Sequence, residues 1–320
     1  MGLRSEDAVT GVREGLGWIR LERLSLIRVT GPQRVKFLHN LLSSDIAGLA
    51  TGHSRLAALM NLKGHQVAWM RVMAEADALI CELPVDVRDT VVDTFVHYKV
   101  GAPVRFERLD TVIFGLLGAK AREALGPLGF SEFAANTENF ATTEGSSGRL
   151  RVNRSLDVPA GGFTLHAERT AAAAIEGELR SGWGDPVSSA TLETLRVEEG
   201  LPWHGVDVLE ENLLHETGQL AIYHSSSKGC YLGQEVVARL EGRGGHVTRK
   251  FRGLKCSRPA ASGNEIVADE KVVGRVTSAG ISPEFGAIAM GYLHRSHAET
   301  GTAVHVAGGE AEVMTLPFKA

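Results

Sequence analysis

The sequence of 320 residues predicts an α+β protein that ends in a small antiparallel β-barrel. Three observations predict this class. Strand-like and helix-like apolar patterns alternate up to about residue 241. Gly242, Gly244 and Gly245 then form a flexible joint. Beyond the joint come six short strand patterns separated by turn residues, with no convincing helical pattern among them.

The first third of the chain predicts strands with two helices. Leu24–Thr30 has a strand pattern, and Gly31-Pro32 ends it and begins a helix, because proline suits the first helical turn. Lys63-Gly64 separates two apolar strands and indicates a hairpin. The other expected elements here are a turn at Asp45, strands 55–62, 65–73 and 78–83, and a helix capped by Asp86.

The middle of the chain is more polar and its pattern is weaker. We expect strands at 104–109, 111–117 and 162–166, and helices at 120–128, 170–179 and after Ser189. The polar stretch 130–149 predicts a loop.

The last part predicts the barrel and sets the domain boundary. Its six strands are expected at 249–255, 265–268, 271–278, 287–293, 303–306 and 310–316. We therefore divide the chain into an α+β region at 1–245, itself two subdomains, and a barrel domain at 246–320.

Composition excludes several classes of protein. Hydrophobic residues make up 43% of the chain and charged residues 22%, which is ordinary for a globular protein. The net charge is −4, and the only dense basic segment runs from Arg239 to Arg252, so no nucleic-acid surface is expected. The chain has no membrane-length apolar run and no secretory or transit pattern at its start, which predicts a cytoplasmic protein without membrane contact.

The three cysteines predict neither a disulfide framework nor a metal site. Cys81, Cys230 and Cys256 are widely spaced, and no CxxC pair is present. Cys81 and Cys256 lie in strand patterns and are expected to be unreactive. Cys230 is either a small buried hydrophobe or a reactive thiol.

The segment around Cys230 is the most unusual in the chain. It reads Lys228-Gly229-Cys230-Tyr231-Leu232-Gly233-Gln234-Glu235. The ammonium of Lys228, two residues before the thiol, can stabilise a thiolate, and a short helix is expected from Gln234 to Leu240. We therefore interpret Cys230 and Lys228 as the candidate catalytic pair.

This segment resembles the K-G-C-Y-x-G-Q-E signature of YgfZ-type proteins at every fixed position. The resemblance extends to segments beginning at Phe37, Leu62 and Gly274. Residues 195–200 also resemble the L-R-x-E-x-G segment of glycine-cleavage aminomethyltransferases. The resemblance to these families implies domains arranged in a ring around a hole that holds tetrahydrofolate.

The resemblance also implies which residues contact the folate. The glutamate of L-R-x-E-x-G contacts the pterin, a role that falls on Glu198, whose alternative is a surface glutamate on a capped helix. Tyr231 and Arg239 are further candidates for binding the cofactor. Arg239 pairs either with a folate carboxylate or with Glu235.

The aminomethyltransferases place an aspartate pair on the second strand of the hairpin and an Asn-Ala pair on the next strand. This sequence has Ala68-Trp69 and Cys81-Glu82 at those positions. The resemblance therefore implies a folate site without the transferase chemistry.

The resulting prediction is a tetrahydrofolate-binding protein. It would act in iron–sulfur cluster assembly or repair, and so in the maturation of cluster enzymes, including tRNA-modifying ones, through Cys230. Its expected partners are folate and iron–sulfur client or assembly proteins. Two alternatives stay open: a folate-dependent aminomethyltransferase, one-carbon transferase or demethylase, and a folate-gated interaction protein in which Cys230 is structural.

Overall fold

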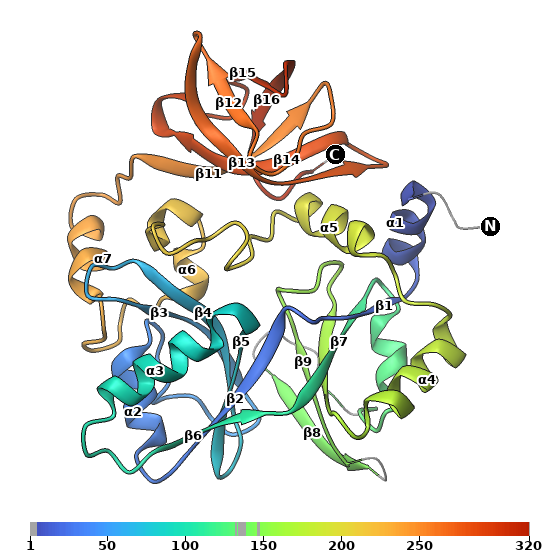
Figure 1. Cartoon of the computed structure of the whole chain (residues 1–320), viewed down its shortest axis with the longest axis vertical. Coiled ribbons are helices and arrows are strands. Elements are labelled where there is room, and N and C mark those ends of the chain that lie inside the picture. Colours follow the sequence, from blue (N-terminus) through green and yellow to red (C-terminus); the bar gives the residue numbers. More distant parts are fainter. Residues whose placement is uncertain (1–4, 132, 134–138, 146–147, 320) are drawn as a thin grey trace.

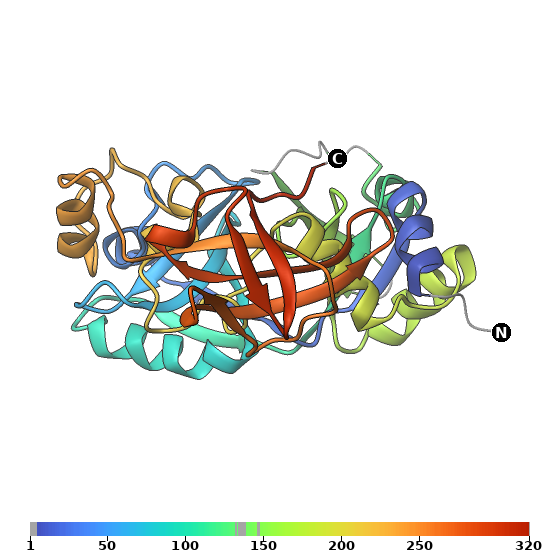
Figure 2. The same ribbon diagram turned by 90° about the horizontal axis from the view of Figure 1, so that it is seen from above.

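The chain forms three units, two antiparallel sheets with their helices and one closed barrel (Figure 1). The computed structural model describes residues 5–131, 133, 139–145 and 148–319. Seen from above, the barrel lies across both sheet units (Figure 2). The predicted α+β class with a C-terminal antiparallel barrel is confirmed.

The first sheet has the strand order β3-β4-β5-β2-β6. Helices α2 and α3 pack on it, and the rings of Phe37 and Phe95, one from each helix, meet edge to face at 5.8 Å. The apolar runs that predict these strands fit the central strands β4 and β5, which are buried on both faces. The elements are β2 (Leu24–Thr30), α2 (Arg34–Leu41), β3 (Ser54–Met60), β4 (Gln66–Ala74), β5 (Ala78–Pro84), α3 (Arg88–Tyr98) and β6 (Arg105–Leu109).

The second sheet has the order β1-β7-β10-β9-β8 and draws its strands from both sides of the first in sequence. Its first strand precedes the first sheet and its other strands follow it, so the two units are interleaved along the chain. The elements are α1 (Ser5–Glu14), β1 (Gly17–Arg20), β7 (Thr111–Leu117), β8 (Phe140–Gly145), β9 (Gly148–Arg154), β10 (Phe163–Glu168) and α4 (Ala172–Trp183).

The sequence predicts the elements of this second unit least well. Helix α1 and strand β1 were not predicted, and the expected loop at 130–149 contains β8 and the start of β9. Residues 132, 134–138 and 146–147 of that stretch lie outside the described residues. The helix expected at 120–128 is a short 3₁₀ turn, Ala121–Leu125. Strand β8 is polar, and it forms because β9 provides a paired edge rather than because of its own sequence.

The barrel closes in the order β11-β14-β13-β12-β15-β16, and all six predicted strands are present. Glycines allow its two longest strands to approach. A Cβ at Gly274 would lie 2.2 Å from the carbonyl oxygen of Tyr292, and one at Gly291 would lie 2.3 Å from that of Arg275. The strands are β11 (Arg249–Cys256), β12 (Glu265–Ala268), β13 (Lys271–Ser282), β14 (Gly286–His294), β15 (Ala303–Val306) and β16 (Gly309–Met314).

Three helices connect the sheets to the barrel: α5 (Ser189–Glu198), α6 (Leu220–Tyr223) and α7 (Gln234–Glu241). Helix α5 packs against the barrel strand β13. Its N-cap is Ser188, one residue before the predicted cap, and the Oγ atom of Ser188 accepts a hydrogen bond from the Thr191 amide at 3.1 Å. The first barrel strand begins at Arg249, and the boundary between residues 245 and 246 stays a prediction.

Candidate functional site

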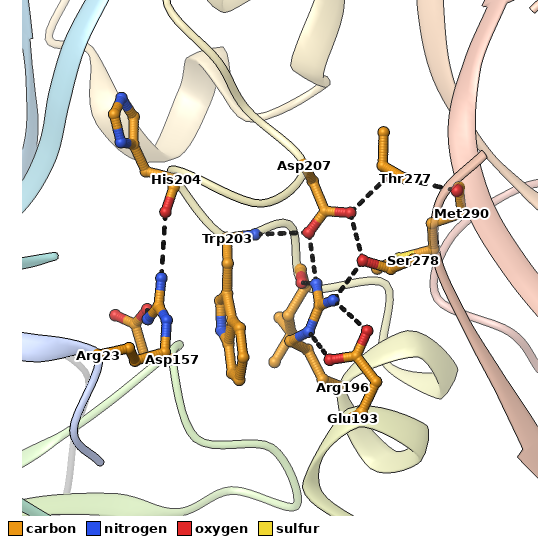
Figure 3. A network of polar contacts seen from close by, with 11 residues as sticks. Arg23, Asp157, Glu193, Arg196, Trp203, His204, Asp207, Thr277, Ser278 and Met290 are labelled. Atoms are coloured by element: carbon orange, nitrogen blue, oxygen red, sulfur yellow. Dashed lines mark hydrogen bonds and ion pairs between the residues drawn. The ribbon is translucent and has the colours of Figure 1, made fainter. Parts of the chain in front are cut away.

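The segment Leu195–Gly200 is held by a buried polar network centred on Arg196 (Figure 3). Arg196 is fully buried, and its Nη1 atom donates to Oδ2 of Asp207 at 2.5 Å. The other carboxylate oxygen of Asp207 accepts hydrogen bonds from the hydroxyls of Thr277 and Ser278, at 2.5 and 2.7 Å. Asp207 therefore joins the L-R-x-E-x-G segment on α5 to the G-x-V-T-S segment on β13.

Most residues of the L-R-x-E-x-G segment have a structural explanation. Leu195 is 1% exposed and belongs to the core beneath α5. Gly200 has a φ of +64°, and a Cβ there would lie 2.6 Å from Cβ of Leu316. Glu198 is the residue of the segment that these contacts do not explain.

Glu198 is 5% exposed, so its alternative reading as a surface glutamate does not fit. Its Oε2 atom accepts a hydrogen bond from Arg13 at 2.6 Å, and Arg13 also pairs with Glu284 at 2.8 Å. Its Oε1 atom is buried and has no hydrogen-bond partner among the described residues. Buried carboxylate oxygens rarely lack a donor, so this atom suits a ligand N–H group.

A small polar cavity lies between the first sheet, the segment that precedes β10 and the segment that follows α5. The Trp69 and Tyr223 rings in its wall stack with centroids 4.1 Å apart. The free volume is about 20 Å³, enough for about one water molecule. The polar and aromatic side chains that line it are Trp69, Arg71, Glu82, Asp157, His204 and Tyr223.

Several polar atoms around this cavity lack partners. Both ring nitrogens of His204 and the Oε1 atom of Glu82 are buried without a hydrogen bond of good geometry to any described residue, and the Gln66 backbone lies near the His204 ring. Burial and the Arg23 guanidinium lower the pKa of His204 to about 4, so its ring is neutral at neutral pH. The cavity is therefore lined by a neutral imidazole and a carboxylate that can each bind a polar group.

Glu82 also connects the two sheets. Its Oε2 atom contacts Nε2 of His166 on β10, and Nε of Arg71 on β4 lies 4.0 Å from Oε1. All three side chains are buried. Burial alone would raise the pKa of the Glu82 carboxyl, but His166 and Arg71 outweigh it and the pKa is lowered. The carboxylate is therefore ionised within the interior.

The positions aligned with the transferase carboxylates carry no aspartate. Ala68 is fully buried, and Trp69 donates its indole N–H to Oε1 of Gln66 at 2.9 Å. Asp157 lines the cavity but is paired with Arg23 at 2.8 Å. The carboxylate that remains on this wall is Glu82.

Of the three cysteines, Cys230 is exposed, and Cys81 and Cys256 are buried. Burial raises the pKa of the Cys81 thiol to about 12 and that of the Cys256 thiol to about 11. The two buried thiols are therefore protonated at neutral pH. The reading of Cys230 as a buried hydrophobe does not fit its exposure.

Lys228 clamps the segment that carries Cys230. Its Nζ atom donates to the backbone carbonyls of His39, Leu42 and Ser44, at and just beyond the C-terminus of α2, with the His39 bond at 2.5 Å. Burial lowers the pKa of its ammonium to about 8. Within the described residues its ammonium has no contact with the Cys230 sulfur. The predicted effect of Lys228 on the thiol stays a prediction, and the clamp is a separate reason for a lysine here.

The glycines of the hairpin and of the signature pack together. Gly233 has a φ of +80°, and a Cβ there would lie 2.6 Å from the carbonyl oxygen of Asn61. A Cβ at Gly64, where φ is +74°, would lie 2.7 Å from Cβ of Val236. Both positions exclude larger residues because of close contact and left-handed backbone. Gly229 has no such contact, because a Cβ there would meet no atom within 4 Å outside its chain neighbours.

Cys230 and Tyr231 lie on one groove of about 590 Å³, formed with α2 and the end of α3. Tyr231 is 8% exposed, and its hydroxyl is buried without a described partner. Arg239 is exposed on α7, and no ion pair with Glu235 occurs within the described ranges.

Glu198 lines neither this groove nor the polar cavity.

The sequence reading missed Arg71, His166 and His204. A single charged or imidazole side chain in a strand or loop pattern resembles a surface position, so periodicity gave no signal for them. Trp69 and Glu82, which the transferase comparison singled out, do line the polar cavity.

The described residues offer neither a metal-binding cluster nor a membrane-spanning helix. No group of three or more His, Cys, Asp or Glu side chains there could hold a metal ion. No helix in the described ranges is long and apolar enough to cross a membrane.

Comparison with known proteins agrees with this architecture. Residues 249–319 match the glycine cleavage T-protein C-terminal barrel domain. The whole chain is similar to the solved structure of aminomethyltransferase T of the glycine cleavage system from Bartonella henselae, with a TM-score of 0.88 and 22% identity, covering 98% of this chain and 89% of that one. This chain therefore has the aminomethyltransferase fold.

Three curated relatives narrow the family. A chloroplastic protein of Arabidopsis thaliana, named as a candidate transferase, is 23% identical over 94% of this chain and 70% of its own length. An aminomethyltransferase of Saccharopolyspora erythraea is 25% identical, over 96% and 88%. The tRNA-modifying protein YgfZ of Yersinia pseudotuberculosis is 28% identical, over 71% and 67%. Together with the K-G-C-Y-x-G-Q-E segment, these similarities support a YgfZ-type protein related to the aminomethyltransferase fold.

Proposed function

We propose that this chain binds tetrahydrofolate and uses the exposed Cys230 thiol to maintain iron–sulfur enzymes, including those that modify tRNA. The observation that carries the proposal is the contrast among its cysteines. Cys230 is exposed beside a groove on a clamped segment, and the other two are buried. An accessible sulfur held in a fixed position is suited to reaction with a partner.

Iron–sulfur chemistry explains why such a sulfur would be useful. Cysteine thiolates are the usual ligands of these clusters, and a stable cluster needs several of them. Cys230 lies in no cluster of metal-ligating side chains among the described residues. A partner would therefore supply the remaining ligands, and Cys230 would act on cluster or sulfur as substrate rather than hold a resident metal.

Tetrahydrofolate binding is supported by the orphan oxygen of Glu198. The aminopyrimidine edge of a pterin carries N–H donors, and Oε1 of Glu198 is a buried acceptor without a described donor. Glu198 would hold that edge, with Arg13 fixing the other carboxylate oxygen at 2.6 Å. When bound, tetrahydrofolate supplies a carrier for one-carbon units. The predicted contacts of Tyr231 and Arg239 with folate remain part of this proposal.

A folate-dependent one-carbon transferase is the second candidate. The observation that favours it is the buried Glu82–His166 pair, with Glu82 on the wall of the polar cavity. Such a pair can hold and move a proton. Against it, Ala68 and Trp69 occupy the positions where the transferases carry aspartates.

The experiment is a rescue in cells that lack the protein. The activity of iron–sulfur enzymes and the level of cluster-dependent tRNA modification are measured with the wild-type chain, Cys230→Ser and the matched control Cys256→Ser. We expect rescue by the wild type and the control but not by Cys230→Ser. Full rescue by Cys230→Ser would remove the thiol from the function. Formation of a one-carbon folate product by the purified chain would favour the transferase.

A further inference from the structure

The groove beside Cys230 has a chemical character that the thiol alone does not explain. Its walls are formed by α2, by the end of α3 and by the signature segment. The two charged side chains in its lining are Lys36 and Lys99, and none of its lining side chains within the described chain is acidic. Neither lysine forms an ion pair in the described ranges. The groove is therefore a positively charged surface on a chain whose net charge is −4.

The groove also has an apolar rim that faces water. Val100 is 89% exposed and Tyr98 is 36% exposed, and both line the groove. Two large exposed side chains on the rim of one groove indicate a surface that another molecule can cover.

The size of this surface favours a protein segment over a small ligand. A groove of about 590 Å³ is larger than a small thiol needs, and Val100 on its rim is 89% exposed. Lys36 and Lys99 would attract carboxylates of the partner, and Tyr98 and Val100 would pack against its aliphatic or aromatic side chains.

We propose that the groove of Lys36, Tyr98, Lys99 and Val100 docks an acidic segment of a partner protein that also carries apolar residues, and that docking brings the partner's sulfur to Cys230. The proposal rests on the proposed function in one respect only, that Cys230 is the working thiol. Docking itself needs no folate and no chemistry at the sulfur.

The first test measures docking without covalent chemistry. Fluorescein-labelled synthetic peptides with alternating glutamate and leucine, or with glutamine or lysine in place of glutamate, are titrated against the full chain by anisotropy. We expect the glutamate peptide to bind best, roughly tenfold better than the glutamine peptide, which is the size that a few exposed charge pairs supply. The preference should shrink as salt is added.

Variants assign the binding to the groove. Lys36→Glu with Lys99→Glu should abolish the preference for the glutamate peptide. The matched control, Lys120→Glu with Lys271→Glu, makes the same change in net charge at exposed positions outside the groove and should leave the preference intact. Val100→Ser should weaken both the glutamate and the glutamine peptide.

The second test asks whether docking serves the thiol. Each peptide receives one cysteine as its 2-thiopyridyl disulfide. The Cys230 thiolate attacks the peptide sulfur, a new S–S bond forms, and pyridine-2-thiolate leaves with the electron pair of the broken bond and takes a proton from water. We expect the glutamate peptide to exchange roughly tenfold faster than the lysine peptide, through the same charge steering. Cys230→Ser should remove the exchange.

The outcomes separate the two proposals. Equal binding of the glutamate and lysine peptides, or a preference unchanged by Lys36→Glu with Lys99→Glu, would overturn the docking groove even if Cys230→Ser fails in cells. A second outcome is charge-selective binding that is unchanged in Val100→Ser and is lost when glutathione disulfide competes. That result would identify a small anionic ligand and overturn the proposal of a protein partner. Selective docking together with full cellular rescue by Cys230→Ser would overturn the thiol function alone.

Discussion

The surroundings of Glu198 and Cys230 differ in almost every physical respect. Glu198 is buried, lies two residues beyond a guanidinium with several acceptors, and has one carboxylate oxygen paired with Arg13. Cys230 is exposed on a segment that the Lys228 ammonium and the close packing of Gly233 hold in place. A buried site with one orphan atom suits a small polar ligand, which can be fully enclosed. An exposed atom on a held loop suits a macromolecule.

The largest effect is expected from removing Arg196. Arg196→Leu leaves Asp207 buried without its cation, and the free energy of unfolding should fall by about 3–5 kcal/mol. Chemical denaturation measures this loss. Arg239→Leu, which removes an exposed guanidinium, is the control and should change little. Similar losses for the two variants would contradict the contrast between a buried junction and an exposed edge.

The second-largest expected effect is a loss of folding stability at acid pH. The folded-state pKa of His204 is about 4, well below the ordinary value of 6.5. The unfolded chain therefore binds the extra proton first, and stability is lost as pH falls from 6.5 towards 4. Between pH 7 and pH 4.5 this group should cost about 2–3 kcal/mol. His204→Gln should lose less stability over that interval than the wild type, as measured by urea unfolding at each pH. Equal losses would show that His204 is not buried in neutral form.

Folate affinity sharpens the comparison at Glu198. Glu198→Ala should weaken tetrahydrofolate binding by about 1.5–3 kcal/mol, because a charge-assisted hydrogen bond is lost. Glu284→Ala removes the other carboxylate partner of Arg13 and leaves the orphan oxygen in place, so it should bind almost normally. Isothermal titration calorimetry measures the affinity of both variants and of the wild type for tetrahydrofolate. Unchanged affinity in Glu198→Ala would exclude Glu198 from the folate site.

The exposure of Cys230 is tested by the reactivity of the three thiols. With a limiting amount of iodoacetamide near neutral pH, Cys230 should be labelled first, because burial raises the pKa of Cys81 and Cys256 and covers their sulfurs. Peptide mass mapping gives the order. Lys228→Met should loosen the segment, and comparison of its labelling rate with the wild type tests whether Lys228 also activates the sulfur. Faster labelling of Cys81 or Cys256 would contradict the prediction that Cys230 is the reactive thiol.

The smallest effect concerns the boundary before the barrel. Gly242 and Gly244 are exposed, and Gly244 has a φ of +78°. Limited proteolysis should cut first between residues 242 and 245, because small residues leave the backbone accessible there. First cleavage at another site, with this turn intact, would contradict the predicted boundary between residues 245 and 246.

The sequence by itself determined the fold class, the six barrel strands and the segment that carries Cys230. These features depend on local pattern: alternation of apolar residues, turn residues and a short contiguous motif. It also directed attention to Glu198, Trp69 and Glu82 through resemblance. Strand β8 was not predicted because its polar sequence becomes a strand by pairing with β9. Helix α1 was not predicted, and the elements that it packs on, α5 and the barrel strand β13, are distant in sequence.

The tertiary structure alone decided which polar groups meet. Asp207 joins α5 to the barrel, His166 reaches Glu82 across two sheets, and Lys228 turns to the carbonyls beyond α2. These partners lie between 11 and 189 positions apart in the chain, and no periodicity links them. The burial that makes Glu198 an orphan acceptor and the exposure that leaves Cys230 free both depend on what packs around them. A linear pattern records which side chains are present, whereas solvation and pairing are set by neighbours that only the folded chain brings together.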